Sequence, residues 1–169
     1  MAITLELYLD HQIIRGDLPI DEGQRPIDLL NTAKGGVIQL TDAWSVSLHA
    51  EAPPVHLNTV RVRRNGILVV IPRSKVQLPP RVLRNGFVEK HPLRVEIGLG
   101  PFTVDGAYYV TGHEPETLAS LEHDPGGRFF VPFTQARLKS QYSPRWKVDG
   151  DLLFVNRGAI SYCYLLPTL

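Results

Sequence analysis

Histidines and acids gather between residues 113 and 124, and side chains of these types can hold a metal ion when they converge. The group consists of His113, Glu114, Glu116, Glu122, His123 and Asp124. The two histidines are ten residues apart and flank a short expected helix, so they fall on different sides of it. This spacing is typical of solvated loop and cap residues. The sequence therefore predicts no metal site.

Other catalytic patterns are absent from the sequence. The chain contains no GxSxG, Walker, HExxH or CxxC motif. Its single cysteine, Cys163, lies in an apolar run with Tyr162 and Tyr164, which favours a buried strand residue over a nucleophile. Asp21 and Glu22 stand where acids are electrostatically favoured, just before an expected helix. We expect a protein that is not an enzyme and has no cofactor.

Basic residues are concentrated in one segment. Residues 60–94 contain nine basic residues and one acidic residue, although the net charge of the whole chain is only +1. The basic residues are Arg61, Arg63, Arg64, Arg73, Lys75, Arg81, Arg84, Lys90 and Arg94. Clustered cations of this kind supply most of the nonspecific affinity of proteins for nucleic acids.

Two interpretations of this basic segment remain open. As a nucleic-acid or anion surface, it offers the candidate contacts Arg61, Arg63, Arg64, Arg81, Arg84 and Arg157. Alternatively, Arg61 and Arg63 are the solvent side of an alternating strand and keep a sheet edge soluble. Only Phe87 interrupts the segment as an aromatic, whereas stacking platforms for bases usually need several. The second interpretation is favoured.

The same plan of residues occurs twice along the chain. Val62, Arg64 and Ile67 return as Val155, Arg157 and Ile160, with the same spacing. Gly16 has a counterpart in Gly106, and each half carries a proline before and glycines after a short leucine-containing segment. We expect a tandem repeat of two small domains, with residues 1–72 as the first, 73–92 as a basic connector and 93–169 as the second.

Most of each half is predicted to be β structure. Ile3, Leu5 and Leu7 alternate with polar residues, which is the pattern of a strand with one buried face. Pro26 and Gly35 bracket a short helix between the second and third strands, and Pro115 with Gly126 predicts a second one. Asn65-Gly66 predicts a tight hairpin. Pro132 predicts an edge or bulged strand.

These residues resemble the signatures of Sm-like small β-barrels. The run Val155 to Ile160 is similar to the second Sm signature, in which Arg-Gly precedes the last strand. Gly16 is similar to the glycine that lets the second strand of the family bend, and Asp42-Ala43 ends an apolar strand in the same manner. The resemblance implies small, strongly bent five-stranded barrels and a nucleic-acid (RNA) function.

This sequence departs from the Sm-like pattern at two places that bear on function. Sm-like proteins place their helix before the first strand, whereas the helix here is expected between strands two and three. No Asp-Asn pair stands where the family holds a base, so the resemblance implies RNA contacts only at Arg64 and Arg157. The fold does not by itself bring the function with it.

Together these patterns predict an all-β protein with minor helix, built as two tandem small barrels. The favoured function is a non-catalytic interaction or assembly module with a protein partner or with itself, followed by nucleic-acid binding and then by a ligand-binding barrel. No apolar run is long enough to span a bilayer, and the acidic start differs from a signal peptide, so we expect a cytoplasmic protein. The expected core residues are Ile3, Leu5, Leu29, Leu30, Ile38, Leu40, Ile67, Val69, Leu118, Leu121, Val131 and Ile160.

Overall fold

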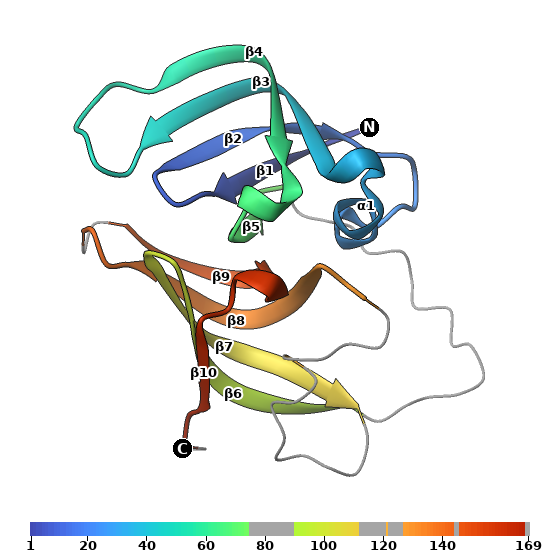
Figure 1. Cartoon of the computed structure of the whole chain (residues 1–169). Coiled ribbons are helices and arrows are strands. Elements are labelled where there is room, and N and C mark those ends of the chain that lie inside the picture. Colours follow the sequence, from blue (N-terminus) through green and yellow to red (C-terminus); the bar gives the residue numbers. More distant parts are fainter. Residues whose placement is uncertain (75–89, 112–120, 122–126, 144–145, 168–169) are drawn as a thin grey trace.

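The protein is described by a computed structural model that covers residues 1–74, 90–111, 121, 127–143 and 146–167. The structure is predominantly β, with one short α-helix among these residues, which confirms the predicted fold class at that level. Figure 1 shows two bent layers of strands, one from each half of the chain, lying one above the other.

The first half forms five strands. They are β1 (Ala2–Tyr8), β2 (Gln12–Pro19), β3 (Val37–Ser47), β4 (Val55–Arg63) and β5 (Val69–Pro72). The helix α1 (Pro26–Thr32) lies between β2 and β3, as predicted, and one 3-10 turn, η1 (Lys34–Gly36), follows it. Gly35 and Gly36 have positive φ angles of 67° and 64°, which explains the glycines at the exit of the helix.

Among its described residues, the second half also forms five strands. They are β6 (Lys90–Leu99), β7 (Phe102–Thr111), β8 (Phe130–Ser140), β9 (Lys147–Asn156) and β10 (Tyr162–Leu165). The helix predicted after Pro115 falls almost entirely outside the described residues. The connector predicted at residues 73–92 is likewise described only at its two ends.

The ten strands form one antiparallel sheet that is not closed. Its order is β10-β6-β7-β8-β9-β5-β1-β2-β3-β4. The two tandem small barrels that the sequence predicts are not confirmed: among the described residues, β5 pairs with β1 and β9 and not with β4. The sheet therefore runs continuously from one half into the other, and its two edges are β4 and β10.

The predicted hairpin at Asn65-Gly66 is wrong. Residues Arg64–Gly66 form a single 3-10 turn, η2, in which the Ile67 N–H donates to the Arg64 carbonyl at 3.2 Å. The strands on either side of this turn pair with other strands, because the turn redirects the chain from the sheet edge toward β1. Asn-Gly thus marks a turn here, but not a hairpin.

The edge position predicted for Pro132 is also wrong. Pro132 lies in β8, which is paired on both sides, with β7 and β9. The described pairing of β8 with β7 stops at Thr134, so Pro132 lies beyond that ladder and its missing N–H is tolerated. The alternative prediction of a bulge is correct, because β8 changes register near Gln135.

The two halves share local features as well as strand order. Within each half the order is fifth, first, second, third and fourth strand. Asp42 in β3 and Gln135 in β8 have φ angles of 46° and 47°, and each lies at a register shift against the preceding strand. A turn like η2 recurs as η3 (Arg157–Ala159), where the Ile160 N–H donates to the Arg157 carbonyl at 3.2 Å.

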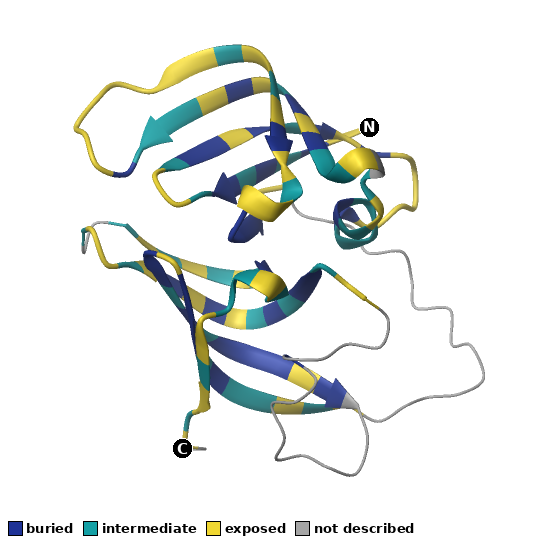
Figure 2. Ribbon diagram, in the orientation of Figure 1, coloured by how far each residue is buried: buried dark blue, intermediate teal, exposed yellow. Residues whose placement is uncertain are grey.

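The core extends through both halves. Of the predicted core residues, Leu29 and Ile160 are half-buried, Leu118 is outside the described residues and the other nine are buried. Phe130 and Phe154 of the second half pack into the core of the first half. Tyr8 and Ile13 of the first half pack into the core of the second half. Figure 2 shows the buried residues on the facing strands of the two layers.

Candidate assembly interface

Arg61 and Arg63 lie on β4, at one edge of the sheet. Both are exposed, while Val62 between them is buried. They therefore form the solvent side of an alternating strand, the arrangement that the favoured interpretation of the sequence expects. Figure 2 shows that most of β4 is exposed.

Arg64, which the sequence offered as a base contact, makes two contacts within the protein. Its Nη1 donates to the Asn31 carbonyl at 2.7 Å, and its guanidinium lies 4.5 Å from the ring centre of Phe129. Arg157 occupies the corresponding place in η3 and is half-buried. Arg81 and Arg84 are outside the described residues.

The remaining described arginines of the basic segment are paired with acids in different places. Arg73 contacts Glu6 at 2.6 Å, and Arg94 contacts Asp105 at 2.6 Å. Lys75 is outside the described residues. Arg73 and Arg94 thus contact different acids, one in each half of the chain.

The junction between the halves is a pair of strands, β5 and β9. Val69 lies opposite Val155, and Val70 lies opposite Phe154. The Asn156 N–H donates to the Leu68 carbonyl at 2.9 Å, and its side-chain Nδ2 donates to the Ile67 carbonyl at 2.8 Å. The fourth strand of one half is therefore hydrogen-bonded to the fifth strand of the other.

The junction is also apolar. Leu68, Val69 and Ile71 are at most 7% exposed, and all three belong to the core cluster that holds most of the second half. On its other side, Phe154 is 3% exposed and packs into the core of the first half. Burial of Val70 between the two halves explains why β5 has apolar residues on both faces.

The strand β4 corresponds to β9 in the other half, and β10 corresponds to β5. The strands β4 and β10 form the edges of the sheet. Among the described residues, the fourth strand of the first half, β4, is paired only with β3, and the fifth strand of the second half, β10, is paired only with β6. Both strands therefore present unpaired backbone groups along one side.

Three apolar or aromatic side chains of β10 are exposed. Tyr162, Tyr164 and Leu165 are 42%, 48% and 43% exposed. The two tyrosine rings stack with their centres 5.8 Å apart and their planes at 9°. The Tyr164 hydroxyl donates to the Glu96 carboxylate, and this bond raises the pKa of Tyr164.

Sequence reasoning did not single out these tyrosines. The signal was present in the repeat, because Tyr162 and Tyr164 follow the second copy of the Arg-containing turn at the same distance as Val69 and Ile71 follow the first. Aligning the turns places the tyrosines at the positions that form the apolar junction.

The structure places no group of three or more potential metal ligands together among the residues that it describes, and the histidine-acid group at 113–124 is almost entirely outside them. Within the same described part of the chain, no helix has the length and apolar character to cross a membrane.

Comparison with known proteins gives no relative. The chain matches no family model, no curated protein and no solved structure. The candidate interface therefore rests on the geometry of the chain alone.

Proposed function

We propose that this chain is a non-catalytic assembly module, a tandem duplication of one five-stranded unit whose copies associate head to tail. The β4 edge of one molecule pairs with the β10 edge of the next. The observation that carries the proposal is the β5·β9 junction, where the fourth strand of one unit already pairs with the fifth strand of the other. The Sm-like signatures agree with such a unit, while the RNA function that they imply has no support from the contacts of Arg64.

The two edges are the positions at which the same junction is left open. Sheet order places β4 and β10 at opposite ends, so one molecule uses one edge for each neighbour. An interface between two different surfaces of identical molecules is heterologous and builds a ring or a filament. Exposed strand edges are templates for this pairing unless they are covered, bulged or charged, and the charges on β4 are those of Arg61 and Arg63.

The junction also supplies the register of the proposed pairing. Aligning η3 with η2 places Tyr162 and Cys163 of one molecule where Val69 and Val70 lie. Their partners in the next molecule correspond to Val155 and Phe154, and are therefore Val62 and Arg61. The N–H of Arg63 then takes the place of the Asn156 N–H, and donates to the carbonyl of Ser161.

The chemistry of the edges favours reversible association. At the internal junction the equivalent positions are filled by Val69, Ile71 and Phe154, whereas the edges carry Tyr162, Tyr164 and Arg61. Tyrosine and arginine are enriched at protein interfaces and tolerate water when the interface is open. The edges therefore remain soluble in the separate molecules and still offer contact area.

A proline substitution tests the edge pairing without disturbing the unit. Arg63 has φ −69°, which proline adopts without strain, so Arg63→Pro removes the outward N–H and little else. Light scattering coupled to size exclusion, across a concentration series, is expected to show oligomers for the wild type and monomers for Arg63→Pro. The matched variant Arg63→Gln keeps the N–H and is expected to keep oligomers.

The same experiment can refute the proposal. A wild type that is monomeric at every concentration would overturn it, and so would an Arg63→Pro variant that assembles as the wild type does. Circular dichroism of both variants identifies a loss of fold. A proline variant that unfolds is replaced by Arg61→Pro, two residues earlier on β4, whose N–H points to the same side of the strand.

A further inference from the structure

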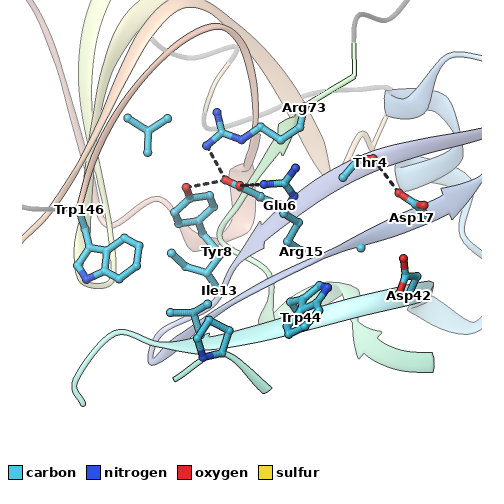
Figure 3. A pocket seen from close by; sticks show the side chains of 14 residues that line it. Thr4, Glu6, Tyr8, Ile13, Arg15, Asp17, Asp42, Trp44, Arg73 and Trp146 are labelled. Atoms are coloured by element: carbon cyan, nitrogen blue, oxygen red, sulfur yellow. Dashed lines mark hydrogen bonds and ion pairs between the residues drawn. The ribbon is translucent and has the colours of Figure 1, made fainter. Parts of the chain in front are cut away.

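Both tryptophans of the chain line one pocket between the two halves. The chain has only two, Trp44 in β3 and Trp146 just before β9. The pocket has a volume of about 610 Å³, which is within the range of small-molecule sites. Figure 3 shows the two indoles on opposite sides of Tyr8 and Ile13.

The floor of the pocket is an apolar and aromatic surface. Tyr8, Ile13 and Val46 come from three neighbouring strands, and Trp146 and Val148 come from the second half of the chain. Trp44 is 45% exposed, and its ring centre lies 4.7 Å from that of His56. The surface suits a flat hydrophobic ring, which indoles bind by stacking.

One side of the pocket carries an excess of positive charge. The Glu6 carboxylate accepts from Arg73 at 2.6 Å and from the Tyr8 hydroxyl at 3.0 Å, so it already has two close partners. Arg15 lies 3.9 Å from the same carboxylate, and its side chain is 58% exposed. Two guanidinium groups thus share one carboxylate, which leaves Arg15 able to receive an anion.

The aromatic surface and the cation are adjacent. Arg15 and Trp44 are directly opposite residues of β2 and β3, so their side chains leave the same face of the sheet side by side. The two remaining acids of the pocket are engaged: Asp17 accepts from the Thr4 hydroxyl at 2.7 Å, and Asp42 pairs with His56 at 2.8 Å. Both lie toward the end away from Trp146 in Figure 3, where their negative charges disfavour an anion, so the anionic group is placed beside Arg15.

The second half lacks these features at the corresponding place. There the opposite residues are Asp105 and Arg137, in the positions of Arg15 and Trp44. Asp105 pairs with Arg94 at 2.6 Å, and Arg137 pairs with Asp149 at 2.6 Å. The charges of this face are neutralised within the protein, and the pocket on it has no aromatic lining residue among those described.

We propose that the pocket between the halves binds a small planar aromatic anion, with its ring on the surface between Trp44 and Trp146 and its acidic group on Arg15. The two halves differ at this face. In the second half its charged residues form ion pairs, whereas in the first half the indole of Trp44 lies beside the guanidinium of Arg15. The pocket is not lined by Arg61, Val62, Tyr162 or Cys163, the residues of the proposed edge pairing, so the site does not depend on assembly.

Three probes measure separately how the aromatic ring and the negative charge of a ligand contribute to binding. Naphthalene-2-carboxylate has both, naphthalene-2-methanol has the ring alone, and cyclohexanecarboxylate has the charge alone. The indole N–H signals of Trp44 and Trp146 in a ¹H–¹⁵N spectrum report binding directly, because these are the only two indoles. We expect both signals to shift with the naphthoate, and its affinity to exceed that of either other probe by about tenfold or more.

Variants locate the acidic group. Arg15→Gln is expected to reduce the affinity for the naphthoate to that for the naphthalene alcohol, while Arg15→Lys restores part of it. Arg25→Gln, an exposed arginine beside α1, is the matched control and is expected to change nothing. Equal affinities for the naphthoate and the alcohol in the wild type would overturn the proposal, as would naphthoate binding that moves neither indole signal.

Discussion

At the scale of single residues, the sharpest constraint is the close approach of two strands at a glycine. A Cβ at Gly16 would lie 2.9 Å from the Cβ of Ala43, and a Cβ at Gly106 would lie 2.7 Å from that of Ala136. Both alanines follow a residue with positive φ, so the tight contact belongs to the bulge in each half. Glycine at these two positions is a steric requirement of the bend.

We predict that Gly16→Ala and Gly106→Ala each lower the free energy of unfolding by about 1–3 kcal/mol, the usual cost of an extra carbon in a packed core. Denaturant unfolding followed by circular dichroism measures the change. Gly66→Ala is the control, because a Cβ there has nothing within 4 Å. Equal stability of the Gly16 and Gly66 variants would contradict this account of the bulge.

At the scale of elements, the sequence predicted the strands and the helix α1 but not all of their partners. The alternation along Ile3, Leu5 and Leu7 correctly predicted which face of β1 is buried, because this pattern depends only on the residues of the strand itself. The strand that pairs with β5 lies far away in the sequence. Val70 lies opposite Phe154, and no pattern within either segment predicts that the two pair. The hairpin predicted at Asn65-Gly66 failed for the same reason.

The helix α1 is hydrogen-bonded to the second half through the side chain of Asn31. Asn31 accepts from the Phe130 N–H at 2.7 Å and donates to the Phe130 carbonyl at 3.1 Å. The helix has seven residues, too few to be stable alone, so this pair of bonds and the packing of Leu30 hold it in place.

We predict that Asn31→Ala destabilises the protein by about 1–3 kcal/mol, because it leaves both backbone groups of Phe130 without these partners. Thermal unfolding measures the effect. Thr32→Ala, which removes only a hydrogen bond to the Asp28 carbonyl within the helix, is the neighbouring control and is expected to cost less. A smaller effect at Asn31 than at Thr32 would show that the helix is held by packing alone.

At the scale of the whole molecule, one continuous sheet carries a junction in its middle and the matching strands at its ends. The repeated spacing in the sequence indicated two units, but it could not indicate that strands pair across them. That pairing depends on residues such as Phe154 and Val70 meeting in three dimensions. The proposed function follows from this arrangement, since an edge that matches an internal junction is complementary to another copy.

The most direct measurement of head-to-tail assembly uses the single cysteine. In the proposed register Cys163 of one molecule lies opposite Arg61 of the next, so Arg61→Cys brings two thiols together between molecules. Under mild oxidation we predict a ladder of covalent oligomers on a non-reducing gel, lost when Cys163→Ser is added. Arg25→Cys, on an exposed arginine beside α1, is expected to give no ladder. Equal cross-linking of the Arg61→Cys and Arg25→Cys proteins would contradict the pairing of β4 with β10.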